Sequence, residues 1–260
     1  MSPPAIHPTA IVEPDARIAP GTTVGPYSVI EGNVVVDADC EIGPHVLLAS
    51  GTRLEKECRI FKGASIGTIP QDLKFGGEDS TITVGAGTTV REFCTLNRGT
   101  KATGETRIGS GCLLMAYCHI AHDCRVGNNV VIANNLAMAG HVEVGNNVNI
   151  GGVVAIHQFV RIGDHAFVGA KCYLNMDVPP FSLCGGEPAR VVGVNKVGLE
   201  RKGFSAQRRS RIKRAFRVLF REERTLDESL KALKKDFDGD VDIEMLVSFS
   251  RDSSRGLLRM

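Results

Sequence analysis

The sequence predicts a mainly β chain: a parallel β-helix built from six-residue repeats, followed by a small C-terminal α-helical domain. Three observations carry this prediction. Aliphatic residues recur at every sixth position through most of the first 180 residues, and glycine often follows them. Near residue 197 this texture gives way to Leu and Phe at helical spacing among Arg and Lys. Stacked repeats of the first kind bury one continuous core.

The six-residue series holds from Ile6 to Ile66, resumes at Val84 for three repeats, and then runs unbroken from Ile108 to Leu174. Three repeats make an 18-residue coil, and strands in neighbouring coils lie about 4.8 Å apart. A second, smaller inward position lies two residues before each aliphatic one. Seven of the eight cysteines occupy it, so they are predicted as small core residues and not as a disulfide framework or a zinc cluster. The sequence assigns no role to the eighth, Cys184.

Two excursions interrupt the predicted solenoid, which spans residues 1–180. The first, 67–83, is polar, rich in Gly and Pro, and contains Gln71, Asp72 and Lys74. A loop that leaves a rigid scaffold is a common place for function. The second, 97–107, is interpreted equally well as a tolerated insertion. Two prolines at 179 and 180 cannot continue a paired strand, so residues 181–197 are predicted as an irregular link.

Residues 198–260 are predicted as the helical domain. Ser205 is placed to cap a helix whose apolar positions form one stripe. Thr225 and Glu228 form a capping box at the start of a second helix, and a last helix is expected from near Asp240 through Phe249.

Composition excludes several classes of protein. The 31 basic and 29 acidic side chains give a net charge of +2, which argues against a strongly basic nucleic-acid binder. No stretch approaches the roughly 20 apolar residues of a transmembrane segment. The N-terminal residues lack the charged segment and apolar core of an export signal, so a cytoplasmic location is expected.

Four of the seven histidines fall within about two predicted coils: His119, His122, His141 and His157. The 18-residue stacking places His122, Gly140 and Gln158 in one column, and it places Asp123 and His141 in the adjacent one. The four imidazoles are therefore predicted to lie along one edge of the solenoid.

This edge has the residues of an acid–base site. A histidine near its ordinary pKa can remove a proton from a sugar hydroxyl at neutral pH. Asp123 can fix the tautomer of His122 and stabilise its imidazolium, and the Gly140 N–H is placed to stabilise an oxyanion.

Several segments resemble the UDP-N-acetylglucosamine O-acyltransferase family of hexapeptide-repeat acyltransferases. They are His119-Ile120-Ala121-His122-Asp123-Cys124, the segments around Gly140-His141 and His157-Gln158, Gln71-Asp72-Leu73-Lys74, Gly193-Val194-Asn195 and the run from Gly198 to Phe204. The resemblance covers essentially the whole chain. It implies a left-handed β-helix, a homotrimer with sites between subunits, and the first step of lipid A biosynthesis.

The resemblance also implies the roles of individual residues. His122 would be the general base on the glucosamine 3-hydroxyl, Asp123 its partner, and Gly140 the oxyanion donor. The donor substrate would be a (R)-3-hydroxyacyl chain on acyl carrier protein, transferred directly, without cofactor or metal. Substrate contacts are implied for Gln71, Asp72, Lys74, His119, His141, His157, Gln158, Asn195 and Arg201.

One position departs from the family pattern. Ala170 stands where the better-known members for long chains carry glycine near the end of the acyl chain. Its extra methyl is predicted to shorten the accepted chain by a carbon or two.

Three other interpretations stay open from the residues alone. One is an acyltransferase of the same fold acting on a 3-amino sugar nucleotide or another acceptor. Another is a carbonic-anhydrase-like lyase, with His119 and His122 as two ligands of a zinc ion. The third is a noncatalytic scaffold, which explains the repeat but not the histidine edge.

Overall fold

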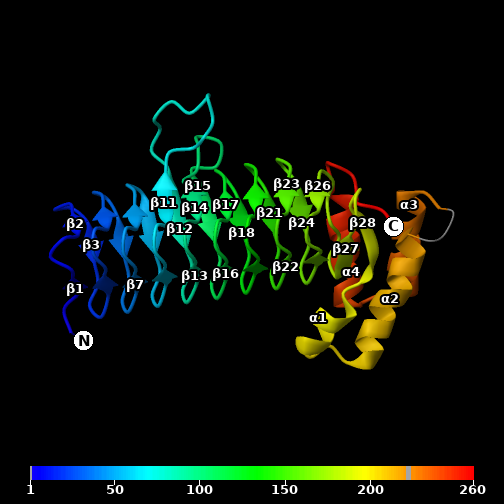
Figure 1. Cartoon of the computed structure of the whole chain (residues 1–260). Coiled ribbons are helices and arrows are strands. Elements are labelled where there is room, and N and C mark those ends of the chain that lie inside the picture. The colour runs from blue at the N-terminus through cyan, green and yellow to red at the C-terminus, as the bar shows by residue number, and fades with distance from the viewer. Residues whose placement is uncertain (1, 221–223) are drawn as a thin grey trace.

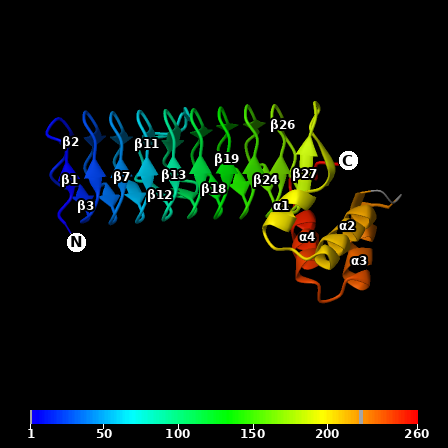
Figure 2. The same ribbon diagram turned by 60° about the horizontal axis from the view of Figure 1, so that its bottom comes forward.

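The computed structural model describes residues 2–220 and 224–260. Its strands wind an elongated solenoid with the N-terminus at one end and the helices at the other (Figure 1). Figure 2 shows the coils stacked along one axis, with the helices beside the last of them. The predicted order, a solenoid followed by helices, is confirmed.

Short strands, nearly all parallel, form the three walls of the solenoid, which we name sheets A, B and C. Sheet A contains β1 (Ala5–Ile6), β4 (Thr23–Val24), β7 (Glu41–Ile42), β10 (Arg59–Ile60), β13 (Thr89–Val90), β16 (Leu113–Leu114), β19 (Val131–Ile132), β22 (Asn149–Ile150), β25 (Phe167–Val168), β27 (Ser182–Gly185) and β28 (Arg190–Val194). Sheet B contains β2 (Ile11–Val12), β5 (Val29–Ile30), β8 (Leu47–Leu48), β11 (Ser65–Thr68), β14 (Thr95–Asn97), β17 (His119–Ile120), β20 (Ala137–Met138), β23 (Ala155–Ile156) and β26 (Tyr173–Leu174). Sheet C contains β3 (Arg17–Ile18), β6 (Val35–Val36), β9 (Thr52–Leu54), β12 (Thr81–Val84), β15 (Glu105–Ile108), β18 (Arg125–Val126), β21 (Glu143–Val144) and β24 (Arg161–Ile162).

The strands pair in the register that the repeat predicts. His119 pairs with Ala137, and Ala137 pairs with Ala155, each 18 residues along the chain. The excursions lengthen the separation without breaking the stack, so that Arg59 pairs with Thr89. Both excursions leave the solenoid between sheet B and sheet C, because residues 69–80 connect β11 to β12 and residues 98–104 connect β14 to β15. The outermost residues of the predicted ranges 67–83 and 97–107 belong to these strands.

The inward aliphatic positions form the core, as predicted. From Val24 to Leu174 none of them is more than 4% exposed. The first coil differs because no coil covers its outer side, and Ile6 is 42% exposed. All eight cysteines are buried and unpaired, including Cys184, which takes an inward position of β27.

The structure differs from the expected irregular link. Residues 181–197 contain β27, which pairs in parallel with β25, and β28, which pairs antiparallel with β27. The prolines at 179 and 180 precede β27, so they do not interrupt its hydrogen bonds, and sheet A extends one coil further than predicted.

Four helices follow: α1 (Lys196–Arg201), α2 (Ala206–Phe220), α3 (Leu226–Asp236) and α4 (Val241–Arg251). The two predicted caps are confirmed: Ser205 Oγ accepts from Arg208 N at 3.2 Å, and Thr225 and Glu228 form the capping box. The last helix begins after Asp240, as expected, and Asp240 caps it. The short α1 was not predicted. In the described part of the chain, every helix is too short or too polar to cross a membrane.

Candidate active site

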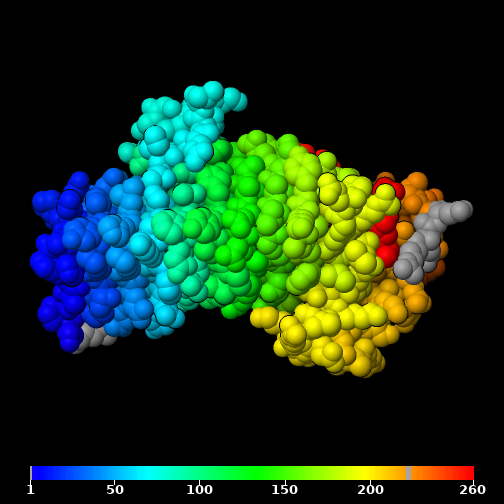
Figure 3. Space-filling model, in the orientation of Figure 1, coloured from blue at the N-terminus to red at the C-terminus, as the bar shows by residue number. Residues whose placement is uncertain are grey.

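The predicted histidine edge lies at the corner between sheets B and C, which we call the B–C corner. Here the chain turns from β17 to β18, from β20 to β21 and from β23 to β24. The two excursions leave the same corner, and Figure 3 shows the first of them standing out from the solenoid. Histidines and loops therefore meet on one side of the molecule.

Successive coils stack their polar side chains at this corner. His141 N donates to His122 O at 3.1 Å, and Phe159 N donates to Gly140 O at 3.3 Å. The ring of His141 stacks on that of Phe159 with centroids 4.7 Å apart, and it meets the ring of His122 edge-on at 5.2 Å. Asp123, His141 and Phe159 all have φ near +60°, a conformation uncommon outside glycine that turns their side chains toward one another.

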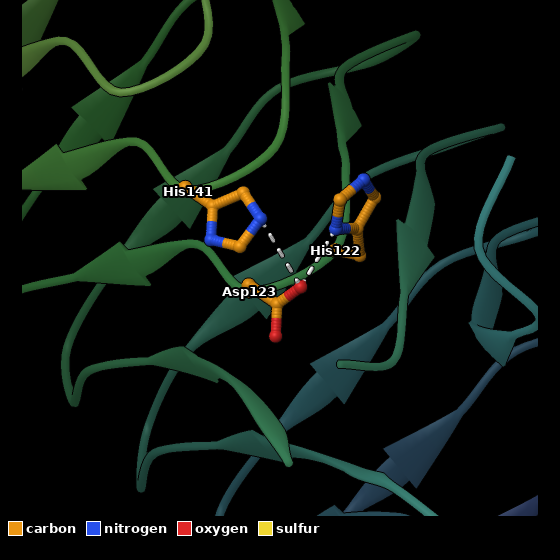
Figure 4. A group of neighbouring side chains, drawn as sticks. All are labelled: His122, Asp123 and His141. Carbon is orange, nitrogen blue, oxygen red and sulfur yellow. Dashed lines mark hydrogen bonds and ion pairs between the residues drawn. The ribbon is translucent and has the colours of Figure 1, made fainter. Parts of the chain in front are cut away.

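His122 and Asp123 form a hydrogen-bonded pair. His122 Nδ1 lies 2.7 Å from Asp123 Oδ2, and His141 Nε2 lies 3.6 Å from the same oxygen (Figure 4). An ionised carboxylate only accepts hydrogen bonds, so the neutral His122 ring carries its proton on Nδ1. His122 Nε2 is then free to accept a proton.

Asp123 is fully buried, and the second excursion supplies its other partners. Thr100 N and Thr100 Oγ1 donate to its two oxygens at 3.0 and 2.7 Å, and the Thr103 hydroxyl donates to Oδ1. Burial by itself would raise the pKa of Asp123, but the hydrogen bonds from Thr103, His122 and Thr100 outweigh it and lower the pKa to about 2. The carboxylate therefore carries its charge throughout the neutral range.

Gly140 lies against the face of the His122 ring. A Cβ atom at this position would lie 2.6 Å from His122 Cε1 and 2.8 Å from Nε2, closer than such atoms approach in proteins. The absence of a side chain is what lets the ring take its position.

The remaining histidines of the edge flank this pair. His119 points out of β17, where its Nδ1 lies 2.7 Å from Thr95 Oγ1, and burial lowers its pKa. His157 is exposed, with its Nδ1 3.0 Å from the carbonyl oxygen of the half-buried Gln158.

The first excursion does not reach the histidines within one chain. Among the described residues Gln71, Asp72 and Lys74 form no hydrogen bond or ion pair with any of them, and Asp72 Oδ1 accepts instead from Lys74 N at 3.0 Å. Leu73 between them is fully exposed.

Asn195 and Arg201 lie elsewhere, on a pocket of about 850 Å³. Its walls are the outer face of sheet A, the corner between sheets C and A, and the helices. Its lysine and arginine side chains are Lys196, Arg201, Lys202, Lys213 and Arg217. The Asn195 amide is already used: it caps α1 through Gly198 N and donates to His165 O at 2.9 Å. One chain thus divides the predicted site residues between two separate surfaces.

Comparison with known proteins identifies the family and the fold. Residues 177–258 match the model of domain 2 of UDP-N-acetylglucosamine O-acyltransferase, and residues 105–137 match the bacterial transferase hexapeptide model. The acyl-[acyl-carrier-protein]–UDP-N-acetylglucosamine O-acyltransferases of Myxococcus xanthus and Halorhodospira halophila are each 46% identical over 255 residues, which cover 98% of this chain and 99% of theirs. The chain belongs to the UDP-N-acetylglucosamine O-acyltransferase family.

Solved structures of the family agree. The UDP-N-acetylglucosamine acyltransferase of Francisella novicida superposes with a TM-score of 0.96 at 33% identity, covering 98% of this chain and 94% of that one. The UDP-N-acetylglucosamine O-acyltransferase of Moraxella catarrhalis superposes with a TM-score of 0.96 at 40% identity, covering 98% of this chain and 99% of that one. The fold is accordingly the left-handed parallel β-helix with C-terminal helices that the resemblance implied.

Ala170, the departure from the family pattern, lies at the corner between sheets A and B, where β25 turns to β26. Its side chain is exposed. It is therefore at a different corner of the same chain from His122.

A zinc site fits the B–C corner poorly. Ligand atoms of His122, Asp123 and His141 lie within 4.8 Å of one another, which is compact enough for an ion. However, both oxygens of Asp123 already accept two hydrogen bonds each, from Thr100, Thr103 and His122. A metal ligand needs a free lone pair, and these carboxylate oxygens already use theirs in hydrogen bonds. The arrangement therefore suits an acid–base pair better than a zinc site.

Sequence reasoning missed Thr100, Thr103 and Thr106. The second excursion gave no motif that pointed to them, and its meeting with Asp123 depends on both leaving the same corner. The one available signal was the spacing of three residues between hydroxyl side chains in a segment otherwise without pattern.

Proposed function

We propose that this chain transfers a (R)-3-hydroxyacyl chain from acyl carrier protein to the 3-hydroxyl of UDP-N-acetylglucosamine, in lipid A biosynthesis, with His122 as the general base. The observation that carries the chemistry is the His122–Asp123 pair at 2.7 Å, which leaves His122 Nε2 free beside Gly140. The names of relatives at 42–46% identity over the full chain support the two substrates.

The reaction follows from the position of Nε2. It takes the proton of the sugar hydroxyl while the hydroxyl oxygen bonds to the thioester carbonyl carbon, and the carbonyl electron pair moves onto oxygen. The tetrahedral adduct then collapses, the C–S bond breaks, and Nε2–H returns the proton to the carrier's sulfur. The Asp123 carboxylate stabilises the imidazolium that exists between these two transfers.

The Gly140 N–H is the proposed donor to the developing oxyanion. Among the described residues it donates to no protein acceptor, and a Cβ on Gly140 would lie 2.8 Å from His122 Nε2, so the glycine is next to the base. A backbone donor fixed in place before the reaction stabilises the charge that forms in the transition state.

The remaining site residues are proposed substrate contacts. His119, His141, His157 and Gln158 surround the base on its own chain, and Gln71, Asp72 and Lys74 extend from the first excursion. Asn195 and Arg201 would contact the nucleotide part of the sugar nucleotide, and the cationic side chains of the pocket suit its diphosphate. The cytoplasmic location expected from the sequence stays a prediction.

The division of these residues between two surfaces supports a homotrimer with shared sites. The corner between sheets A and B carries exposed apolar side chains, Tyr27, Phe93, Tyr117 and Val153, each at least 45% exposed. Sheet C presents a column of charged side chains instead, in which Arg107, Arg125, Glu143 and Arg161 follow one another. Packing around the apolar corner would bring the B–C corner of one subunit toward sheet A and the pocket of the next.

The proposed reaction is tested by incubating the protein with UDP-N-acetylglucosamine and carrier proteins loaded with 3-hydroxyacyl chains of graded length. We expect a 3-O-acyl product with a single preferred length. No product with any donor, or a product only with the 3-amino analogue of the sugar nucleotide, would contradict the proposal.

The same panel of donors tests the role of Ala170. Ala170→Gly should move the preference toward chains one or two carbons longer, and an unchanged profile would remove the role of Ala170.

Mixed oligomers test the shared site. His122→Ala and Arg201→Ala homotrimers should each be nearly inactive. Co-expressed with different affinity tags and purified through both, the mixed trimers should regain about one active site in three, because one interface then holds both intact residues. Activity no higher than that of the two separate variants would contradict a site built from two subunits.

A further inference from the structure

The second excursion, residues 97–107, returns to the B–C corner and directs three hydroxyl groups at Asp123. Thr100 and Thr103 bind its carboxylate, and Thr106 Oγ1 accepts from Asp123 N at 2.8 Å. Thr100, in the loop, is 7% exposed, Thr103 is exposed, and Thr106, in β15, is fully buried. The loop is thus packed onto the acid–base pair and does not simply project from the solenoid.

We propose that Thr100 and Thr103 are positioning residues for catalysis: they hold the Asp123 carboxylate in one orientation and one ionisation state, and so keep His122 Nε2 unprotonated and aimed at the acceptor. This inference rests on the proposed function, since it assigns the threonines to the base of that reaction.

The geometry leaves the carboxylate no freedom. Its Oδ1 accepts from Thr100 N and from the Thr103 hydroxyl, and its Oδ2 accepts from Thr100 Oγ1 and His122 Nδ1. The Thr103 hydroxyl also lies 2.9 Å from Glu105 O, but an ionised carboxylate is the stronger acceptor. The Asp123 side chain is 0% exposed, so its oxygens have protein donors and no bulk water around them. Thr103 itself is exposed, so the substitution that removes its hydroxyl must keep its shape.

The ionisation state decides which nitrogen of His122 can act as base. A buried carboxyl without donors favours its protonated form. A protonated Asp123 would donate to Nδ1 and leave the ring proton on Nε2, where it blocks the reaction. The threonines oppose this by stabilising the charged form.

The hydrogen bonds from the threonines also weaken the electrostatic effect of the Asp123 carboxylate on His122. When only one donor is removed, Asp123 stays ionised at neutral pH, but fewer hydrogen bonds offset its negative charge. That charge then stabilises the His122 imidazolium more strongly. The variant should therefore hold a proton on His122 Nε2 more readily than the wild type does, which moves the acid limb of activity to higher pH. In the described part of the chain, two other titratable groups face Asp123: His141 from the next coil, and the buried thiol of the adjacent Cys124, whose pKa burial and the Asp123 charge raise. Lys101 and Glu105 flank the threonines in the sequence, and neither forms an ion pair with Asp123 among the described residues.

The experiment compares Thr103→Val, which keeps the shape but loses the hydroxyl, with Thr103→Ser, which keeps the donor. Valine should lower kcat/KM by about tenfold at its plateau and move the acid limb upward by roughly half a pH unit, and serine should restore both. Thr83→Val is the matched control, because Thr83 Oγ1 donates to the carboxylate of Glu105 at 2.6 Å and not to Asp123.

Three results would overturn the inference: a Thr103→Val enzyme with unchanged rate and pH profile, a lower rate with an unmoved acid limb, or a serine variant that fails to restore them. An NMR titration of the His122 ring in wild type and Thr103→Val measures the same shift without any substrate. It keeps this inference testable if the wild type proves inactive with every donor, a result that would count against the proposed function alone.

Discussion

Replacing His122 by alanine is expected to lower kcat by about three orders of magnitude, within the range of 10²–10⁴ that general acid–base catalysis usually contributes. The variant keeps Gly140, the threonine loop and both substrate surfaces, but it has no group to take the hydroxyl proton. Asp123 cannot substitute, because it is fully buried and its pKa of about 2 makes it a poor base. The measurement is the single-turnover rate of acyl transfer with the preferred donor.

His7→Ala is the matched control for this variant. His7 lies in the exposed first coil, where its Nδ1 lies 2.9 Å from Thr9 Oγ1, and its loss should leave the rate unchanged. Circular dichroism and the oligomeric state should be the same for both variants and the wild type. Transfer that survives in His122→Ala at more than about a tenth of the wild-type rate would exclude His122 as the base while leaving the family assignment intact.

The solenoid could be predicted in detail because its periodicity repeats one physical requirement many times. Every inward position between Val24 and Leu174 faces the same core, so a single irregular residue does not disturb the pattern. The same register predicts that His122, Asp123, Gly140 and His141 lie together, since 18 residues along the chain correspond to one step along the axis.

Where the six-residue repeat is interrupted, it no longer predicts which residues lie together. The excursions 67–83 and 97–107 lie outside the six-residue repeat, so the repeat does not indicate that one of them folds onto Asp123 and the other does not. The strand β27 was missed because the two prolines before it suggested an end to pairing, whereas they occupy the turn that precedes the strand. The helix α1 is only six residues long and contains Gly198, which hides any helical pattern.

Gly140→Ala is expected to lower kcat by about a hundredfold, because displacing a reacting group by about 1 Å can cost that much. The added Cβ would lie 2.6 Å from His122 Cε1, so the ring must move. The ring cannot move far without breaking the 2.7 Å hydrogen bond to Asp123, whose carboxylate is held by three further donors. The backbone N–H that serves the oxyanion remains, so the loss reports the position of the base.

Gly185→Ala is the control for adding a methyl group to this fold. A Cβ there would lie 3.8 Å from Val192 Cγ2, an ordinary contact, and the rate should not change. The double variant His122→Ala with Gly140→Ala then separates two roles for the glycine. If Gly140 acts only by making room for the ring, the second substitution should cost nothing once the ring is gone. If its N–H also stabilises the oxyanion and the methyl shifts that N–H, the double variant should be slower than His122→Ala by a further measurable factor, since the donor and the base would then contribute independently.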